Sequence, residues 1–519
     1  MTRLSGMPSY WTTLTHGGVY FPPPYQPVGL SIAVKGRRVR LSPLAEEMAY
    51  HLAKKKDTPY IQDPVYRKNF MHDFIPQVPE IDRSTAYEDV DFSEFFGQVD
   101  AEKRAKESMS KQAKKGQAAS RKQSREALKS KYGFATLDGN SVEIANYMVE
   151  PPGLFMGRGQ HPLRGRWKPR VSVDDVVLNL DESALVPPGE WKEIVHDHNS
   201  MWMAKWIDKL TEKEKYVWLH ESSPLQQKRN RAKYDNAAKV GRSLGRIRAR
   251  ISEKLESKKA TDRQVATVCY LIDRLGMRVG DEKDEDEADT VGASTLRVEH
   301  VKFDGESVEF SFLGKDSVPW NKRDTPPPAV MSNLKEFMGK KKPGQELFHE
   351  VTSTMVNEFL SSIVPGVSAK VFRTFHATDE TRRHLGSANV REGEEQDKIQ
   401  EAKEANLAAA IWCNHQRTPP KTWEQSYERK RERLALAKAK PNPQKIRKLE
   451  DELDFYKRTK NYNLNTSLKN YIDPRVYKSW GDYVGLDWKK VYSKSLQKKF
   501  SWVDQSKVRW QPEEAPDSP

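Results

Sequence analysis

The stretch Thr261–Gly280, "TDRQVATVCYLIDRLGMRVG", carries the clearest structural pattern in the chain. Its apolar side chains recur at intervals of three and four residues, at Val265, Val268, Cys269, Ile272 and Leu275. This spacing places them on one face of a helix, and Thr261 with Gln264 three residues later has the pattern of a capping box. The sequence therefore predicts a core-facing helix capped at Thr261.

The same spacing reaches Arg278, three positions after Leu275, where an apolar residue is due. A guanidinium among apolar side chains needs an anionic partner. The acidic run "DEKDEDEAD" at 281–289 follows at once and offers an internal partner, whereas a substrate phosphate is the alternative. The run lacks the ligand spacing of an EF-hand loop, so we expect a solvated loop there and no divalent metal site.

The bulk composition favours a polyanionic partner. With 519 residues the chain is long enough for about three domains. Its 88 Lys and Arg exceed its 73 Asp and Glu, and the net charge of +15 makes nucleic acid the first candidate partner and a membrane surface the second. No stretch approaches about 18 consecutive apolar residues and no signal-peptide core follows Met1, so we expect a soluble protein that is not secreted. Cys269 and Cys413 are too few for a disulfide framework or a zinc site.

Two stretches in the N-terminal part are densely basic. Residues 101–131 are rich in Lys and Arg, lack Pro, and have only Ala and Met at every fourth position from 101 to 113, which predicts one long, mostly solvated helix. Residues 151–170, "PPGLFMGRGQHPLRGRWKPR", alternate Gly, Pro and Arg and therefore predict a loop. Its arginines suit phosphates or a groove, and an ordinary basic surface loop is the alternative. The chain contains no P-loop motif.

A β-hairpin is predicted further along the chain. "TLRVEHVKF" at 295–303 and "SVEFSFLG" at 307–314 alternate with a period of two around the turn signal Asp304-Gly305. Lys315 comes directly after the second strand. A lysine at such a position is either solvated or held out to reach into a groove.

Arg373 and His415 are two further candidates for contacts with an anion. Arg373 lies between Phe372 and Phe375 and is thus a second arginine with apolar neighbours. His415 follows a helical stripe of Ala and Trp between 402 and 412. Because a helix C-terminus favours cations, we expect a protonated imidazole that donates hydrogen bonds there, with an ordinary surface or core histidine as the alternative.

The C-terminal part begins with a charge-dense stretch at 423–456 that "KAKPNPQK" divides in two. This pattern predicts an antiparallel helical hairpin that projects from the body. A later set of bulky residues at i+4 spacing predicts one helix docked on the body; it comprises Trp488, Tyr492, Leu496 and Phe500. The composition of the tail "QPEEAPDSP" at 511–519 predicts disorder.

Tyr471 lies in "TSLKNYIDPRV", directly before a predicted helix start with Asp473 as N-cap and Pro474 as first helical residue. A single tyrosine in this position usually packs against its neighbours. The chain, however, also supplies donor side chains suited to phosphodiester chemistry, namely Arg278, Lys315, Arg373 and His415. A tyrosine oxygen attacks phosphorus in such a reaction, arginine forks meet the non-bridging oxygens, and a lysine gives its proton to the leaving oxygen.

Nine motifs spread over nearly the whole chain are specific enough to indicate a family: "YFPPPYQP", "RLSPLAEE", "YRKNF", "EPPGLFMGRGQHP", "LRVEH", "FLGKDS", "AKVFRT", "CNHQRTPPKT" and "LNTSLKNYIDPR". With them the chain closely resembles the eukaryotic-type DNA topoisomerase I family, the type IB enzymes. The resemblance implies that Tyr471 is the nucleophile and that Lys315 protonates the leaving 5′-hydroxyl. It also implies that the scissile phosphate is held by Arg278, Arg373 and His415.

The resemblance also implies a role at the DNA and drug site for three further residues. Arg158 and Asn470 match family positions that line the cleavage site, and Asp316, like both of these, matches a position associated with camptothecin-type poisons. The implied partner is double-stranded supercoiled DNA, bound by a monomer, with camptothecin-type inhibitors as ligands of the covalent complex. The implied location is the nucleus of a cellular host, in replication and transcription, or a viral factory or virion if a large DNA virus encodes the chain.

The fold implied by the resemblance is an α+β multidomain clamp with a mixed N-terminal cap, a mainly helical catalytic domain and a helical-hairpin linker. Its parts are a DNA-binding cap at 1–223, a catalytic core at 224–420, the linker at 421–459, a C-terminal domain at 460–503 and a tail at 504–519. The enzyme would nick one strand through a 3′-phosphotyrosyl link, let the free end rotate, and religate without ATP, metal or other cofactor. The alternatives are a tyrosine recombinase or integrase, and a non-catalytic chromatin protein that clamps DNA.

The chain departs from the usual family pattern in four ways. The recognisable body starts within the first dozen residues, so no long charged tail precedes it and nuclear import is open. Met156 replaces a commonly basic residue, Phe375-His376 stands where Tyr-Asn is usual, and the helical hairpin is short. We expect the last three departures to tune the grip on DNA or the drug response and to leave the chemistry intact.

Overall fold

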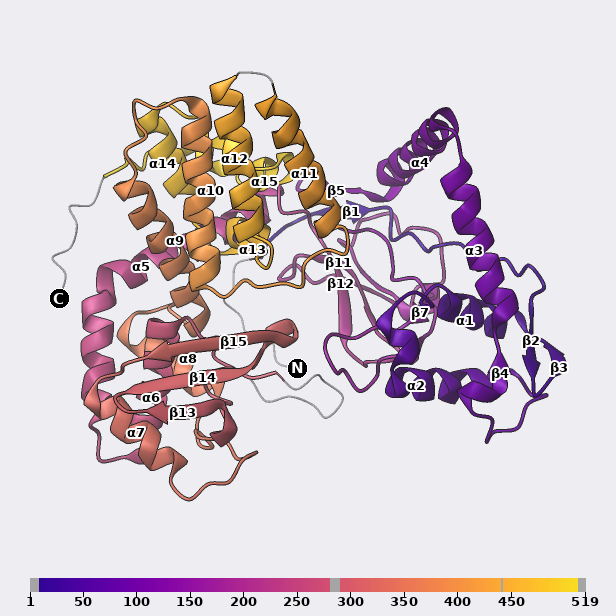
Figure 1. The fold of residues 1–519 in the computed structure, drawn as a ribbon, viewed down its shortest axis with the longest axis horizontal. Helices are drawn as coiled ribbons and strands as arrows, with labels where there is room; N and C mark the ends of the chain where they lie inside the picture. Colours follow the sequence, from indigo (N-terminus) through magenta and orange to yellow (C-terminus); the bar gives the residue numbers. More distant parts are fainter. Residues whose placement is uncertain (1–8, 281–289, 440–441, 512–519) are drawn as a thin grey trace. The chain divides into compact units, whose positions relative to one another are not determined.

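The computed structural model of the protein describes residues 9–280, 290–439 and 442–511, so the predictions for the acidic run and for nearly all of the tail lie outside it. The chain divides into two compact units, unit 1 with the described residues up to Gln226 and unit 2 with those from Gln227 onwards (Figure 1). Helices take up 51% of the residues and strands 14%, with most sheets in the N-terminal part. The fold is therefore mixed α/β, which confirms the predicted change from a mixed N-terminal region to a helical C-terminal one.

One part of unit 1 packs two helices on an antiparallel sheet with the strand order β3-β2-β4. Ser42 caps α1 and Asp63 caps α2 through side-chain oxygens, and a proline occupies the first position of each helix. Phe70 and Phe74 of α2 are fully buried in this core. The elements are β2 (Ser31–Val34), β3 (Arg37–Arg40), α1 (Pro43–Ala53), α2 (Pro64–Phe74) and β4 (Val90–Asp91).

The basic stretch forms two helices, α3 (Ser93–Ser108) and α4 (Lys111–Tyr132), so the prediction of a single helix over 101–131 is wrong. Met109 leaves the helical conformation at ψ 136°, and the Ser110 side chain accepts a hydrogen bond from a backbone amide of the next turn, which starts the second helix. None of the 22 residues of α4, all of them described, is buried. The predicted solvation of this region is therefore confirmed.

The second part of unit 1 contains a three-stranded sheet in the order β1-β5-β6 and a four-stranded sheet in the order β10-β9-β11-β12. Trp11, Leu178 and Trp206 are buried in the core that these sheets share. The strands are β1 (Leu14–His16), β5 (Phe134–Leu137), β6 (Asn140–Glu143), β9 (Val177–Asn179), β10 (Glu193–Val195), β11 (Trp202–Ile207) and β12 (Glu214–Trp218).

The stretch 151–170 is a loop as predicted, apart from a two-residue ladder between β7 (Gly153–Leu154) and β8 (Trp167–Lys168). Two arginines of the loop, Arg164 and Arg166, pair with aspartates at the two ends of α2. Their guanidiniums hold the loop to its own unit, so these two arginines serve the fold, a role that the sequence did not predict.

Unit 2 begins within the long helix α5 (Pro224–Leu255) and continues with α6 (Ala260–Leu275). Lys259 occupies the N-cap position of α6 without a side-chain cap, and the Thr261 hydroxyl donates a hydrogen bond to the carboxylate of Glu350. The predicted capping box is therefore wrong, because a charged acceptor from another segment takes the hydroxyl.

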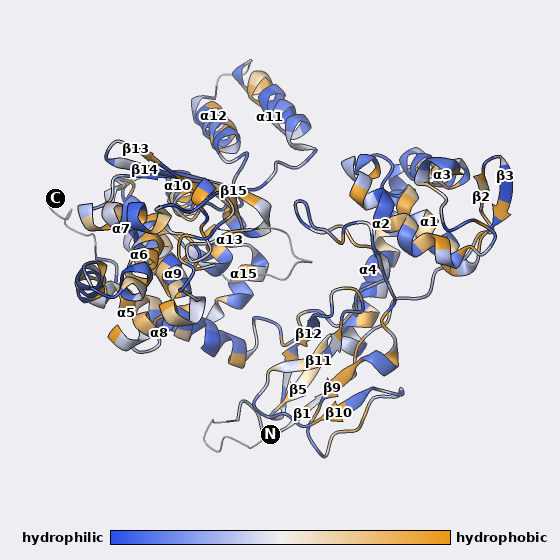
Figure 2. Ribbon diagram, turned by 90° about the horizontal axis from the view of Figure 1, so that it is seen from below, coloured by the Kyte–Doolittle hydropathy of each residue, from blue (hydrophilic) through white to orange (hydrophobic). Residues whose placement is uncertain are grey.

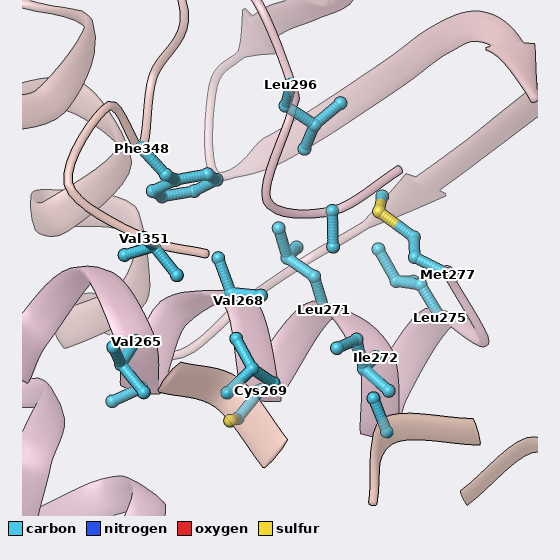
Figure 3. Packing of buried hydrophobic residues seen from close by; sticks show 14 of the residues in the cluster. Val265, Val268, Cys269, Leu271, Ile272, Leu275, Met277, Leu296, Phe348 and Val351 are labelled. Carbon is cyan, nitrogen blue, oxygen red and sulfur yellow. The ribbon is translucent and has the colours of Figure 1, made fainter. Parts of the chain in front are cut away.

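The predicted apolar stripe of α6 faces the main core of unit 2 (Figure 3). Val268, Leu271 and Ile272 are almost inaccessible to solvent, and Leu296 and Phe348 from later segments belong to the same cluster. Truncating a buried leucine of this kind to alanine costs about 2–5 kcal/mol. The core-facing helix is thus confirmed, and it anchors the segment that follows it.

Helix α6 ends at Gly276, whose backbone adopts the left-handed conformation at φ +69°. The chain therefore leaves the helix before Arg278, and the prediction that Arg278 continues the helical stripe is wrong. A Cβ atom at position 276 would lie 2.8 Å from the ring of Trp412, so this position needs glycine for its conformation and for space.

The predicted hairpin of unit 2 forms, with Asp304 paired to Ser307 and Gly305 at φ +60° in the turn. Its first strand is shorter than the predicted 295–303, because Val298–His300 form a 3-10 turn before the strand begins at Val301. A third strand, which the sequence did not predict, pairs with β14 over seven residues of its length. Lys315 lies in the short 3-10 turn that joins the last two strands. The elements are β13 (Val301–Asp304), β14 (Ser307–Gly314), η6 (Lys315–Ser317) and β15 (Val318–Asp324).

The remaining body of unit 2 is helical, with α9 packed along α10 and with α13 and α14 packed on this pair. The small side chains Ala402, Ala405 and Ala409 of α10 are buried, which confirms the predicted stripe and lets its neighbours approach closely. The helices are α7 (Pro328–Met338), α8 (Ser353–Ile363), α9 (Ala369–Ser387), α10 (Glu395–Trp412), α13 (Leu464–Asn470) and α14 (Pro474–Val484).

The C-terminal segment forms three short pieces, η7 (Trp488–Val491), α15 (Lys494–Lys499) and η8 (Ser501–Gln505), so the single predicted helix is wrong. Ser493 caps α15 with its hydroxyl oxygen and thereby starts a new helix inside the predicted one. The four bulky side chains that suggested docking are all buried in the core around α14, which confirms that the segment docks on the body.

The predicted helical hairpin consists of α11 (Trp423–Lys438) and α12 (Pro443–Arg458), and the centre of its predicted turn at 440–441 lies outside the described residues. Figure 2 shows both helices as mostly hydrophilic, and α12 is joined to α10 by ion pairs such as Arg458 with Glu404. At the base of the pair, the Trp423 ring stacks on the ring of Tyr456 with 5.5 Å between their centres.

Candidate active site

Four of the five predicted catalytic residues line one pocket of unit 2. They come from separate elements: Arg278 follows α6, Lys315 joins β14 to β15, Arg373 lies in α9 and His415 follows α10. The fold thus brings together residues that are up to 137 positions apart in the chain, from 278 to 415. Local sequence patterns selected these side chains singly, and the tertiary structure places them around one cavity.

Tyr471 lies between two helices, at the end of α13 and three positions before the start of α14. Asp473 caps α14 and Pro474 is its first residue, as predicted. The backbone of Tyr471 is held on both sides, because its amide donates to the Ser467 carbonyl at 2.9 Å and its carbonyl accepts from the Thr378 hydroxyl at 3.3 Å. This arrangement gives the tyrosine a fixed place.

Tyr471 as a whole residue is 7% exposed, and the predicted phosphate ligands lie around it. Its ring centre lies 4.7 Å from that of His415 and 5.4 Å from the guanidinium carbon of Arg373. Arg278 lies close enough to Tyr471 for the phenol to oppose the lowering of the Arg278 pKa that burial and the charge of Arg373 cause. Two cations and an imidazole therefore meet at one phenol, an arrangement that stabilises negative charge on or near its oxygen.

Arg373 is buried and is held by backbone carbonyls. Its two terminal nitrogens donate to Gly276 O at 2.9 Å and to Cys413 O at 2.6 Å, while Nε has no partner among the described residues. These bonds join the segment after α6 to the segment after α10. The guanidinium thus keeps a fixed orientation at the pocket wall.

His415 is also buried, and its Nδ1 lies 2.7 Å from the Ser467 hydroxyl oxygen. Its Nε2 has no hydrogen-bond partner in the described part of the chain. Burial first, and then the charges of Arg373 and Arg278, lower the pKa of His415 to about 3. The protonated imidazole predicted from the helix terminus is therefore wrong for the DNA-free protein, because desolvation and two guanidiniums outweigh the helix dipole.

Lys315 and Asn470 are exposed. The backbone carbonyl of Asn470 accepts a hydrogen bond from the ammonium of Lys233 at 2.9 Å. Arg158 is exposed in unit 1, where its own loop carries it. The side chain of Asp316 lies outside the described residues. The structure thus places Lys315 at the pocket and leaves the predicted DNA-contacting roles of the other three residues as predictions.

The described residues contain neither a cluster suited to a metal ion nor a helix suited to span a membrane. In residues 9–280, 290–439 and 442–511, no group of three or more His, Cys, Asp or Glu side chains is placed to hold a metal ion. Within the same ranges, no helix is both long and apolar enough to span a membrane.

Comparison with known proteins finds three family descriptions along the chain. The DNA-binding fragment of eukaryotic DNA topoisomerase I matches residues 9–219, its catalytic core matches 222–451, and a C-terminal topoisomerase domain matches 443–512. DNA topoisomerase 1 of Homo sapiens is 34% identical over 543 residues, which cover 95% of this chain and 70% of the human protein. The chain belongs to the eukaryotic DNA topoisomerase I family. It is a type IB DNA topoisomerase, an isomerase that relaxes DNA.

A plant and an insect relative show a similar identity to this chain. DNA topoisomerase 1 beta of Arabidopsis thaliana is 35% identical over 539 residues, covering 95% of this chain and 58% of the relative. DNA topoisomerase 1 of Drosophila melanogaster is 34% identical over 527 residues, covering 95% and 54%. Family membership confirms the resemblance inferred from the motifs, and it decides for the topoisomerase over the recombinase.

Three residues of the topoisomerase site were missed by sequence reasoning. Ser467 contacts the imidazole of His415, and the Thr378 hydroxyl donates to the backbone carbonyl of Tyr471. Lys322 donates to backbone carbonyls of the two segments that carry Arg278 and His415. Ser467 and Thr378 lie on short or amphipathic helices where hydroxyls are common, so no local pattern marks them. Lys322 lies on the strand that the sequence did not predict.

Proposed function

We propose that the enzyme relaxes DNA through a covalent 3′-phosphotyrosyl link formed by Tyr471. The observation that supports this proposal is the convergence of Arg278, Arg373 and His415 on the Tyr471 phenol. Buried cationic donors of this kind stabilise the charge of a pentacoordinate phosphorus without reorganising during the reaction. The free DNA end then rotates, and reversal of the same step reseals the strand.

In the proposed cleavage step the Tyr471 phenol releases its proton to water, its oxygen bonds to phosphorus, and the bond from phosphorus to the 5′-oxygen breaks. The guanidiniums of Arg278 and Arg373 face the non-bridging oxygens, where a planar fork that never loses its charge is most useful. His415 donates from Nε2, the ring nitrogen that has no other partner among the described residues. Lys315 gives a proton to the departing 5′-oxygen.

The predicted domain roles belong to this proposal. Residues 1–223 form a DNA-binding cap that closes as a clamp against the catalytic core at 224–420, with the linker at 421–459 and the C-terminal domain at 460–503. Arg158, Asp316 and Asn470 line the cleavage site. The enzyme acts as a monomer in the nucleus of a cellular host, without ATP or metal, and camptothecin-type inhibitors bind its covalent complex.

Relaxation of a supercoiled plasmid in EDTA without ATP tests the reaction. The unchanged enzyme should relax the plasmid, and Tyr471→Phe should not, although its DNA affinity should stay nearly the same because every cationic contact remains. Relaxation by a pure Tyr471→Phe preparation would refute the assignment of the nucleophile. DNA binding without relaxation by the unchanged enzyme would favour the non-catalytic chromatin protein.

The proposed role of Lys315 has its own test. Lys315→Ala should slow cleavage of an ordinary strand and recover on a strand with a 5′-thiol leaving group, since a thiolate departs without a proton. Equal loss on both strands would mean that Lys315 only positions the DNA.

A further inference from the structure

Lys322 joins the two chain segments that carry Arg278 and His415. Its ammonium nitrogen donates to Leu275 O, at the end of α6, and to Trp412 O, at the end of α10, each at 2.8 Å. Arg278 and His415 both lie three positions after these carbonyls. One side chain of β15 thus holds the ends of two helices whose following residues line the pocket.

Arg373 repeats this arrangement one residue further along both segments. It donates to Gly276 O and Cys413 O, the carbonyls directly after those that Lys322 binds. Two cations from different elements therefore bind four carbonyls, two successive ones on each of the two segments. We call this arrangement the double clasp, formed by Lys322 and Arg373.

The packing around the double clasp leaves little room for the segments to shift. The ring of Trp412 lies so close to Gly276 that a Cβ atom there would be 2.8 Å from it. The side chain of Asn414 donates to Pro319 O at 2.9 Å and so ties the same segment to β15 a second time. Since β15 follows the turn that carries Lys315, the clasp also links this turn to the other predicted catalytic residues.

The chemistry of the clasp explains why a cation is used. The last carbonyls of a helix lack partners within the helix and carry partial negative charge. One ammonium group can therefore donate hydrogen bonds to two helix ends at once. Lys322 lies 5.5 Å above the Trp320 ring and 5.3 Å above the Trp412 ring, which further suits a cation. Burial, followed by the charge of Arg373, lowers the pKa of Lys322 to about 8, so it stays protonated at neutral pH. A charge kept in so unfavourable a place indicates a function.

We propose that Lys322 is a positioning residue of the cleavage reaction, which sets the distance and orientation of Arg278 and His415 relative to each other and to the Lys315 turn. This inference rests on the proposed roles of those three residues. Lys322 is not among the residues that line the pocket. It acts through the backbone carbonyls that it holds.

The alternative role for a lysine so near the site is that of proton donor to the leaving oxygen. The two roles differ on a strand with a 5′-thiol leaving group. A proton donor is no longer needed there, whereas the non-bridging oxygens still need their ligands. A positioning residue must therefore show the same loss on both strands.

The test compares Lys322→Met, which keeps length and removes charge, with Lys322→Arg, which keeps charge and donors. Lys302→Met is the matched control, because Lys302 is an exposed lysine on β13 of the same sheet. Single-turnover cleavage is measured on duplexes with 5′-oxygen and 5′-thiol leaving groups. DNA affinity is measured with each change placed in the Tyr471→Phe enzyme, and folding is checked by circular dichroism.

Lys322→Met should cleave both duplexes about 10- to 100-fold more slowly than the control, as expected when catalytic groups are displaced by a fraction of an ångström or more. Its DNA affinity should equal that of the control, and Lys322→Arg should recover most of the rate. If Lys322→Met does not fold, Lys322→Gln, which keeps two N–H donors without charge, is measured against the same control with the same expectation.

Three results would overturn the inference. They are a cleavage rate of the charge-removing variant equal to that of the control, a loss that disappears on the 5′-thiol duplex, and an arginine variant as slow as the methionine variant. Failure of the proposed function gives a different result, because Tyr471→Phe would then relax DNA whatever residue stands at position 322.

Discussion

The rings of His415 and Tyr471 lie 4.7 Å apart, centre to centre, in the DNA-free enzyme. The imidazole is neutral there, since burial and the charges of Arg373 and Arg278 lower its pKa to about 3. When the Ser467 hydroxyl donates to Nδ1, the proton of the neutral ring is on Nε2, which faces no other partner among the described residues. His415 is therefore suited to act as a neutral hydrogen-bond donor beside the nucleophile.

A neutral donor can be replaced by another neutral donor. We expect His415→Gln, whose amide N–H can occupy the place of Nε2–H, to retain within about tenfold of the cleavage rate, and His415→Ala to lose about 10²- to 10³-fold, the usual cost of removing one such donor. Single-turnover cleavage of a suicide duplex by both variants measures the difference. Equal loss in the two would show that charge or ring packing, and not the donor, is what matters at position 415.

The same residue predicts a pH dependence of stability. The ordinary pKa of histidine, 6.5, applies to the unfolded chain, and the pKa of His415 in the folded protein is about 3. As the pH falls below about 6.5, the unfolded state therefore binds a proton that the folded state does not bind. This contribution to the free energy of unfolding is fully present above pH 6.5 and is lost progressively down to pH 3. At pH 5 the loss amounts to about 2 kcal/mol.

Denaturant unfolding of the enzyme and of His415→Gln at pH 7 and pH 5 measures this contribution. The variant should lose less stability between the two values. His51 of unit 1, whose pKa burial lowers to about 4, supplies the control, because its replacement should change the acid sensitivity of unit 1 and leave that of unit 2 unaltered. An identical loss in His415→Gln and in the unchanged enzyme would contradict a neutral, buried His415.

Local sequence patterns predicted the elements that carry the site better than the way in which the site is assembled. The apolar stripe of α6 was visible because its period repeats, but the end of the helix before Arg278 depends on Gly276 packing against Trp412, a residue 136 positions later. The break between α3 and α4 follows from Ser110, since an exposed helix has no packing to override a strong cap.

The carbonyls bound by Lys322 lie 47 and 90 residues away, so no spacing rule could find that lysine. Strand β15 itself reads "VPWNKRD" and contains a proline and several charged residues, which lowers its strand propensity. It forms because β14 supplies a partner over its full length. Pairing partners and shared backbone acceptors are tertiary facts, and they account for most of what the sequence left undetermined.

The arginines of the loop at 151–170 should separate into two kinds. Arg158 is exposed, whereas Arg164 is 7% exposed and pairs with Asp63 through two hydrogen bonds. Arg158→Ala should weaken DNA binding and reduce the slope of log affinity against log salt by about 0.9, the value for one lost phosphate contact. Arg164→Ala removes the same charge but should leave that slope unchanged and destabilise unit 1 by about 1.5–3 kcal/mol.

DNA binding titrations at several salt concentrations, with thermal unfolding of both variants, check this separation. An unchanged salt slope in Arg158→Ala would remove Arg158 from the DNA interface. A changed slope in a fully folded Arg164→Ala would mean that the guanidinium leaves Asp63 to reach DNA.

The helical hairpin should act on DNA rotation and not on cleavage. Apart from Trp423, Ala437 and Leu449, its described residues are at most partly buried, and its second helix is held to α10 by polar pairs such as Arg447 with Asp397. Deleting about one turn from each arm, residues 436–439 and 443–446, leaves the aromatic stack at the base and the Arg447 pair in the chain. Cleavage of a short suicide duplex should be unchanged, because the deletion removes no predicted catalytic residue.

What should change is the number of supercoils lost per nicking event, since a shorter hairpin offers less surface to the rotating DNA. Single-molecule relaxation traces measure that number directly. Gln444→Ala is the matched control, because the deletion also removes the Gln444 bond to Glu394 and the substitution removes only that bond. Loss of suicide cleavage in the shortened enzyme, with the control intact, would mean that the hairpin supports the fold around Tyr471, and the separation of rotation from chemistry would be wrong.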